Sequence, residues 1–416
     1  MVSNKTLAGK FLSQGKLQWL IVLFCQFIFI GFVCSRALAS IGMMAILGLS
    51  LIFYGIPGTF RRYFRKKELL VLSLYFLIVF ISGIYSEDKE SWLNWVRIKL
   101  PYIALPLAFA PLGKLDDKKF RWLIHGFIFT MVISAIVVLI RYYLNYQAIT
   151  ESFNRGNGIP MPFSHIRYTL MLAFSFFCCL YVLEQKYFLF DETEKWPLII
   201  MAVFIFLALH ILTVRSGLLA LYLGVFYWVL YQIFKRRRFL VGAVLLVALA
   251  FLPLVAYRTI PSLHNKFNYM DYDLKQYQSG NINEYSDAMR IVSMKAGIKV
   301  WKQNILIGKG SGDIEKETNM VYDSDYPQIS ISNRRVPHNQ FIWLLATTGI
   351  IGLAAFLFAF MFPLFATGYY KNWIFLVFHL ILFSSFFTED TFEEQIGTGF
   401  YIIFLMILMN RLQPNE

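Results

Sequence analysis

Charged residues are scarce in this sequence. Only 15% of its 416 residues are Asp, Glu, Lys or Arg and 58% are apolar, whereas soluble domains carry about 25% charged residues. This composition argues against a soluble enzyme, a disordered chain and a nucleic-acid-binding domain. The apolar residues suffice for roughly twelve membrane spans of about 20 residues each. We therefore expect an all-α polytopic membrane protein.

Cysteine is also rare. The four cysteines, Cys25, Cys34, Cys178 and Cys179, all lie inside apolar runs, where a thiol packs as a small hydrophobic group. The adjacent pair would point about 100° apart on a helix, and no histidine or second cysteine pair accompanies it. We expect neither a disulfide nor a thiolate metal site.

Long apolar runs divide the chain into candidate spans. A short run at 101–112 contains three prolines, so we expect it to be kinked. The layout predicts an N-terminal bundle of about nine spans at 1–256, a large hydrophilic loop at 257–340, and three C-terminal spans at 341–416. The twelve predicted spans are 17–35, 37–57, 69–85, 101–112, 120–142, 168–184, 196–214, 217–234, 239–256, 341–366, 372–388 and 396–411.

Basic residues are distributed unevenly between the loops. With the N-terminus inside, the short inner segments hold twenty Lys and Arg residues and the short outer segments hold eight. Lys and Arg accumulate in short cytoplasmic loops, and long loops do not follow this rule. We expect both termini in the cytoplasm and the 257–340 loop outside, with much of the net charge of +14 explained by topology.

The large loop contains two recognisable patterns. Residues 286–303 predict an amphipathic helix, with Ile291, Met294, Ile298 and Trp301 on one face. The glycine-rich run 308–312 resembles a phosphate cradle, but it lacks the full P-loop spacing and a preceding strand. We favour a turn there.

His338 ends the large loop in the sequence Pro337-His338-Asn339. Proline suits the first turn of a helix, so we expect His338 at a helix N-terminus, where the positive end of the dipole disfavours the imidazolium. A neutral imidazole can accept a proton. The alternative is a capping or interfacial histidine.

Arg215 interrupts two apolar runs near a predicted helix N-terminus at the outer face. Its planar donors and the helix N–H groups suit a phosphate, while contact of the side chain with lipid headgroups is the alternative. Other outer residues are weaker candidates for the same site. Lys99, Arg97 and Arg167 could add charge to a phosphate site or anchor helices at the interface, and Glu389 and Asp390 could bind acceptor hydroxyls or form a solvated turn.

Taken together, these segments resemble the O-antigen ligase and polymerase family of bacterial inner-membrane glycosyltransferases. The resemblance covers the whole hydropathy layout, and Val214 departs from it where family members often have serine. The segments that carry it are Thr213–Leu221, Arg290 followed by Gly308–Gly312, Pro337–Phe341 with Thr348-Gly349 and Gly352, and Thr388-Glu389-Asp390 with Glu394-Gln395.

The resemblance implies the transfer of a glycan from undecaprenyl diphosphate to a sugar hydroxyl, such as one on lipid A-core, at the periplasmic face. Attack of the hydroxyl on the face opposite the diphosphate would invert the anomeric centre. On the family pattern His338 is catalytic, and Arg215 and Arg290 hold the diphosphate, without a metal or cofactor. Asn339 joins the candidate acceptor-binding residues. The expected partners are the lipid-linked donor, the glycan acceptor and membrane lipids, and no nucleic acid.

Three alternatives remain open at the level of sequence. A polymerase that joins repeat units and a protein O-oligosaccharyltransferase share the chemistry but differ in acceptor. A transporter of the lipid-linked sugar would place ionisable groups near the bilayer midplane. The charges here collect at one outer face, which favours an enzyme.

Overall fold

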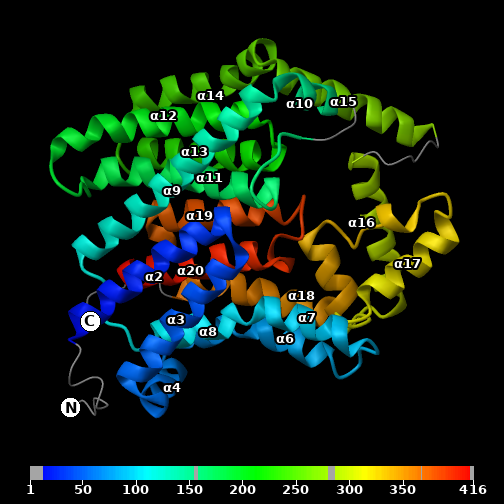
Figure 1. The fold of residues 1–416 in the computed structure, drawn as a ribbon, viewed down its shortest axis with the longest axis horizontal. Coiled ribbons are helices and arrows are strands. Elements are labelled where there is room, and N and C mark those ends of the chain that lie inside the picture. Colours follow the sequence, from blue (N-terminus) through cyan, green and yellow to red (C-terminus); the bar gives the residue numbers. More distant parts are fainter. Residues whose placement is uncertain (1–12, 154–157, 280–285, 367, 413–416) are drawn as a thin grey trace.

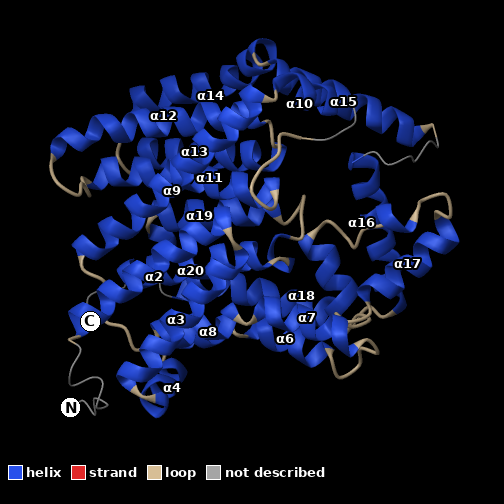
Figure 2. Cartoon of the chain, in the orientation of Figure 1, coloured by secondary structure: helices blue, strands red, loops and turns tan. Residues whose placement is uncertain are grey.

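The computed structural model describes residues 13–153, 158–279, 286–366 and 368–412. Within these ranges the regular structure is helical and contains no strand (Figure 2). Lys5, Lys10 and Arg155, which entered the count of basic residues, lie outside the described ranges. The expected all-α class is therefore confirmed for the described part of the chain.

Nine helices in the described residues are long and apolar enough to cross a membrane, since a bilayer core needs about 20 residues. This supports the prediction of a multi-pass membrane protein. The nine are α2 (Gln14–Cys34), α3 (Arg36–Tyr54), α9 (Asp117–Leu144), α11 (His165–Gln185), α12 (Lys195–Leu212, preceded by the 3₁₀ turn Glu192–Glu194), α13 (Arg215–Phe234), α14 (Phe239–Thr259), α18 (Gln340–Ala366) and α20 (Gln395–Leu412).

The other three predicted spans form shorter helices. The 69–85 run is divided at Ser73 into α5 (Lys67–Leu72) and α6 (Leu74–Ser82), and the Ser73 side chain bonds to Tyr63 and to the carbonyl of Tyr102. The proline-rich run forms α8 (Pro101–Phe109), and the last run forms α19 (Trp373–Ser385). The count of twelve spans therefore stays a prediction.

The helices form one bundle with a buried centre and an exposed apolar edge. The apolar windows of α11 and α20 are each 83% buried, whereas that of α14 is 11% buried. Figure 1 shows α14 along the upper edge and α20 between other helices. Aromatic rings fill the centre, with Phe404 of α20 packed against Phe29, Phe127 and Phe174.

The beginning of α2 and the end of α20 meet at one end of the bundle. Gln18 donates to the carbonyl of Gly113 at 3.2 Å, and Asn410 accepts from the backbone N–H of Leu115 at 2.7 Å. The helices of the large loop lie at the opposite end (Figure 1). The arrangement agrees with an even number of crossings between the two described ends of the chain.

Residues 257–340 hold more helix than the sequence pattern indicated. Three helices occupy the segment, α15 (Pro261–Gln278), α16 (Ser286–Gln303) and α17 (Ile314–Asp325), and α16 has the predicted bounds. Its buried face differs from the prediction. Val292, Ala296 and Val300 pack into a small core with α17, and Ala288 is also buried, while Ile291, Met294, Ile298 and Trp301 are only half-buried.

Three shorter helices complete the description. α4 (Ile56–Arg65) follows α3, α7 (Lys89–Lys99) precedes α8, and α10 (Tyr146–Phe153) follows α9. α7 and α10 lie at the same end of the bundle as α16 (Figure 1). This end gathers the outer residues that the sequence analysis selected.

Candidate active site

His338 stands immediately before the cap of α18. The Asn339 side-chain oxygen accepts from the backbone N–H groups of Phe341 and Ile342, both at 3.0 Å, which is the bonding pattern of an N-cap. The helix therefore begins at Gln340, and the prediction that Pro337 starts its first turn is wrong. Asn339 also donates to the carbonyl of Phe387 at 3.0 Å. These contacts favour a structural role for Asn339 over acceptor binding.

Two carboxylates hold the His338 ring. Nδ1 lies 3.1 Å from Glu389 Oε1 and 3.6 Å from Asp390 Oδ1, and both carboxylates are nearly buried. The backbone N–H of His338 donates to Ser293 Oγ of α16 at 3.3 Å. The ring is thus fixed between the large loop and the turn that precedes α20.

The carboxylates decide the protonation of His338. Burial lowers the pKa of the His338 ring. Hydrogen bonds to Asp390 and Glu389 and the charges of these carboxylates have a larger, opposite effect and raise the pKa to about 9. Burial and the neighbouring Glu389 raise the pKa of Asp390, while hydrogen bonds from His338 and Asp390 hold that of Glu389 well below its usual range. The expectation that the helix dipole keeps the His338 imidazole neutral is therefore not met. The effect of the carboxylates outweighs a dipole contribution of about 0.3–1 kcal/mol.

Arg167 holds the acidic turn 389–394 from α11. It donates to the carbonyls of Thr391 at 3.1 Å and Asp390 at 2.8 Å, and it pairs with Glu394 at 3.3 Å. Its side chain is buried. These contacts favour the positioning of the turn over the predicted role in diphosphate binding.

Lys99 is also committed to the acidic turn. Its side chain is fully buried, and Nζ lies 2.7 Å from Glu393 Oε2 and donates to the carbonyl of Phe392. Arg97, by contrast, lies on the exposed face of α7 and bonds to Asn94 at 3.2 Å. Neither residue borders the cavities described below. The predicted diphosphate role of both residues finds no support in these positions.

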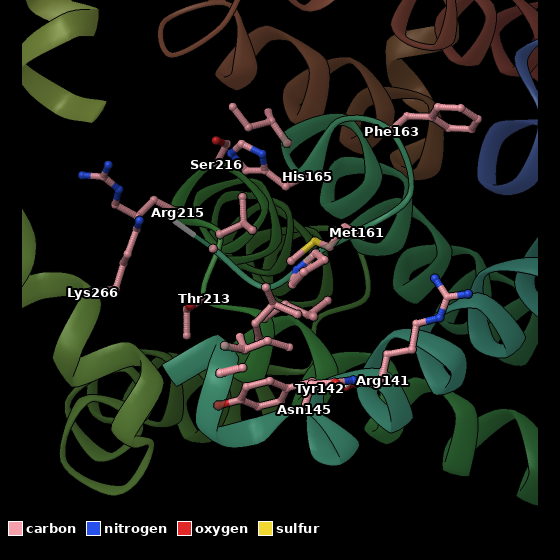
Figure 3. Close-up of a pocket in the computed structure, with 18 of the residues that line it drawn as sticks. Arg141, Tyr142, Asn145, Met161, Phe163, His165, Thr213, Arg215, Ser216 and Lys266 are labelled. Atoms are coloured by element: carbon pink, nitrogen blue, oxygen red, sulfur yellow. Dashed lines mark hydrogen bonds between the residues drawn. The ribbon is translucent and has the colours of Figure 1, made fainter. Parts of the chain in front are cut away.

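A cationic cavity of about 1150 Å³ opens beside the N-terminus of α13. Figure 3 shows Arg215, Lys266 and Arg141 around it. No carboxylate occurs among the described residues that line it. An anion is the ligand that this surface would stabilise, because five basic side chains and none of the described carboxylates line it. The basic side chains that line it are Arg141, Arg215, Lys266, Arg290 and Arg335.

A smaller pocket of about 290 Å³ connects this cavity to His338. Arg215, Ser216 and Arg290 line both, and the smaller pocket also contains His338 and Thr388. Residues from the N-terminus of α13, from α16 and from the α18 cap thus converge over more than 120 positions of sequence. The structure brings together the three residues predicted from the family pattern.

Acidic residues pair with both arginines. Arg215 forms an ion pair with Asp287 and contacts Met270 Sδ at 2.7 Å. Arg290 lies 3.8 Å from Glu389 Oε2. Asp273 of α15 accepts from the backbone N–H of Asp287 at 2.8 Å, which fixes the start of α16. The guanidinium groups are therefore oriented before any ligand arrives.

Three cations of the cavity were missed by the sequence analysis. Arg141 lies in the last turn of α9, Lys266 lies on α15, and Arg335 precedes the α18 cap. Burial lowers the pKa of Lys266, and the charge of Arg215 adds to that effect. Each residue lacks a local motif, so only its place beside Arg215 could have identified it.

An apolar groove of about 650 Å³ adjoins the cationic cavity. It runs between α2 and α9, where Ile30, Val33, Phe129 and Ile133 form its walls. Three residues, Arg141, Pro160 and Met161, line both the groove and the cavity. The candidate site therefore combines the apolar groove and the cationic cavity.

His338, Glu389 and Asp390 could in principle ligate a divalent cation. Their donor atoms lie within 4.8 Å of one another. The same carboxylates, however, face Arg290 at 3.8 Å and Arg167 at 3.6 Å. Positive charge at these distances opposes cation binding and favours the imidazolium as their partner.

The fold is that of a multi-pass membrane protein with a cationic cavity at one end of its bundle. Residues 200–357 match the family model described as O-Antigen ligase. This match supports membership of the O-antigen ligase family, as the resemblance found in the sequence implied. The family is one of glycosyltransferases with lipid-linked glycan and acceptor partners.

The matched segment begins within α12 and ends within α18. It includes Arg215, Arg290 and His338, whereas the acidic turn and Arg167 lie outside it. No curated protein is significantly similar to this chain in sequence. The roles of individual residues are therefore argued from their geometry.

Proposed function

We propose that this protein transfers a glycan from an undecaprenyl diphosphate carrier to a sugar hydroxyl of an acceptor such as lipid A-core, at the periplasmic face of the bacterial inner membrane. The observation that carries the proposal is the border shared by two pockets. Arg215, Ser216 and Arg290 line both the cationic cavity and the pocket that holds His338. A diphosphate in the cavity would lie beside a proton acceptor.

Arg215 and Arg290 bind the diphosphate in this proposal. Guanidinium groups donate paired hydrogen bonds to phosphate oxygens, and the N-terminus of α13 adds backbone N–H groups. Negative charge grows on the diphosphate as the glycosidic bond breaks. Cations oriented in advance stabilise that charge, so the proposed chemistry requires no metal.

His338 acts as the general base. The acceptor hydroxyl oxygen attacks the anomeric carbon, the bond from that carbon to the diphosphate oxygen breaks, and its electron pair leaves with the diphosphate. The hydroxyl proton passes to His338 Nε2, and Glu389 and Asp390 stabilise the imidazolium. Attack opposite the leaving group inverts the anomeric configuration.

The apolar groove accommodates the polyprenyl chain near the diphosphate. Its walls on α2 and α9 are apolar, and it meets the cationic cavity at Arg141. An isoprenoid would lose contact with water there while its diphosphate remained among cations. The two chemical halves of the donor thus match the two adjoining spaces.

The test is glycan transfer by purified protein from a lipid-linked donor to an acceptor glycan. His338→Ala is expected to lower the rate by about 10²–10⁴-fold, the usual contribution of a general base. Arg215→Ala is expected to weaken donor use, while Arg97→Ala, on an exposed face away from the cavities, serves as the matched control. Full activity of His338→Ala would overturn the proposal, and loss of activity with a chelator would overturn its metal independence.

The acceptor is tested in cells that lack the gene. Accumulation of lipid-linked polymer of normal length, without attachment to lipid A-core, indicates a ligase. Accumulation of single lipid-linked repeat units indicates a polymerase, and loss of glycan from protein indicates an oligosaccharyltransferase. The absence of glycan transfer by the purified protein would be the result expected of a flippase.

A further inference from the structure

Helix α18 is interrupted inside its length. Gly349 has φ 65° and ψ −167°, which lies outside helical geometry. A β-carbon at this position would lie 2.2 Å from the carbonyl oxygen of Leu306. Glycine is therefore needed both for the backbone angle and for the close approach of another segment.

The segment 305–310 of the large loop fills this interruption. The N–H groups of Lys309 and Gly310 donate to the carbonyls of Ala346 and Thr347, both at 2.9 Å. On the other side of the break, Ile350 N–H donates to the carbonyl of Ile305 at 3.0 Å. The loop thus satisfies backbone groups that a broken helix would leave without partners, as membrane depth requires.

Backbone hydrogen bonds also define the conformation of the glycine-rich run 308–312. The N–H groups of Ser311 and Gly312 donate to the side chains of Ser82 at 3.3 Å and Ser86 at 3.1 Å. Gly308 and Gly310 have φ of 67° and 95°. The run is a turn, as the sequence pattern favoured, and its N–H groups are occupied by protein rather than available to a phosphate.

The tip of this loop is apolar and exposed. The exposed fractions are 48% for Ile305, 63% for Leu306 and 41% for Ile307. They lie next to Ile350 and Ile351, which are 45% and 59% exposed on α18. The tip therefore continues the exposed apolar surface of a candidate membrane helix.

The length of α18 places the tip at the membrane boundary. Seventeen residues run from Ile350 to Ala366, which is about 25 Å of helix. The hydrocarbon core of a bilayer is about 30 Å thick. When Ala366 lies at the inner boundary, Ile350 and the tip lie at the depth of the outer leaflet.

Aromatic residues surround the tip in a way that fits this depth. Trp301 Nε1 donates to the carbonyl of Ile305 at 3.1 Å, and the Tyr85 hydroxyl donates to that of Ile307 at 2.8 Å. Lys302 is exposed one residue after Trp301. Trp, Tyr and Lys are the residues that anchor membrane proteins at the headgroup level.

We propose that Ile305–Ile307 inserts into the outer leaflet and contacts lipid acyl chains. The hydropathy pattern predicted that the large loop lies wholly outside the membrane. In this proposal the middle of the loop is instead anchored in the outer leaflet. This contact would hold α16, which carries Arg290, at a defined height above the donor lipid. The proposal depends on the membrane location alone and not on the proposed reaction.

The experiment places a fluorescent label on the tip. The full chain carries Cys34→Ala, because Cys34 is exposed whereas the other three cysteines are buried. Leu306→Cys is labelled with an environment-sensitive nitrobenzoxadiazole dye and reconstituted in vesicles of phosphatidylethanolamine and phosphatidylglycerol. Lys316→Cys, exposed on α17, is the matched control. Quenching is measured with nitroxide-bearing acyl chains and with aqueous iodide.

We expect nitroxide lipid to quench the label at position 306 several-fold more strongly than the label at 316, with the reverse order for iodide. Equal iodide quenching at both positions would overturn the proposal, because the tip would lie in water. Protection of position 306 from both quenchers would also overturn it, because protein, such as a second copy, would cover the tip. Ile307→Cys carries the same expectation if the first variant does not fold.

Discussion

His338 shows how neighbouring residues set the strength of a base. Its two carboxylate partners favour the imidazolium, so they stabilise the product of proton transfer and also reduce the fraction of neutral ring at pH 7. The helix N-terminus has the opposite but smaller effect. A strong base in the free site is the result.

The pH dependence of transfer follows from this arrangement. With the His338 pKa raised to about 9, kcat/KM is expected to rise with pH until the ring is deprotonated. Glu389→Gln removes a charge that raises this pKa, so the rising limb should move to lower pH. Rates measured from pH 6 to 10 check the direction. An unchanged profile would mean that His338 is not the group whose deprotonation limits the reaction.

Lys99 and Glu393 form a buried pair that supports the acidic turn. Lys99→Met should destabilise the protein by about 3–5 kcal/mol, because Glu393 is left as a buried charge without its partner. The double variant Lys99→Met/Glu393→Gln should recover part of that loss in thermal unfolding in detergent.

The control for this pair is Arg97→Met, which changes an exposed cation two residues away. Its unfolding temperature should not change. If Lys99→Met kept its stability and only raised the donor KM, the predicted diphosphate role would be restored.

At the level of elements, the break in α18 links the large loop to the membrane bundle. Gly349→Ala should destabilise the protein strongly, because its φ is 65° and the new β-carbon would collide with Leu306. Gly368→Ala is the matched control, since Gly368 has φ 72° but no atom within 4 Å of a built β-carbon. The control should cost about 1–2 kcal/mol. Thermal unfolding that gives equal losses for both variants would show that the loop contact contributes little.

Element boundaries were predictable where the sequence pattern was local. The bounds of α16 followed from capping and spacing, whereas its buried face did not, because that face includes the small residue Ala296, which packs in a core with α17. The break between α5 and α6 also escaped prediction. Ser73 lies in an apolar run, and the partners of its side chain, Tyr63 and the Tyr102 carbonyl, lie outside that run.

For the whole molecule, the two described ends lie opposite the candidate site, and the distribution of basic residues predicts which end is cytoplasmic. In the Cys34→Ala background, Met320→Cys on α17 should react with a membrane-impermeant maleimide in cells with a permeabilised outer membrane. Lys195→Cys, exposed at the start of α12, should react only after lysis. The reverse labelling pattern would place the site in the cytoplasm and contradict the proposed orientation.

The sequence by itself determined the class of the protein and its apolar helices, because composition and periodicity are local signals, and the family resemblance predicted Arg215, Arg290 and His338 as site residues. Tertiary structure alone decided which charges meet. In the folded protein His338 contacts Glu389, Lys99 pairs with Glu393, and Lys266 lines the cationic cavity. Electrostatic interactions act over a few ångströms of space, and helix packing brings residues together without regard to their separation along the chain.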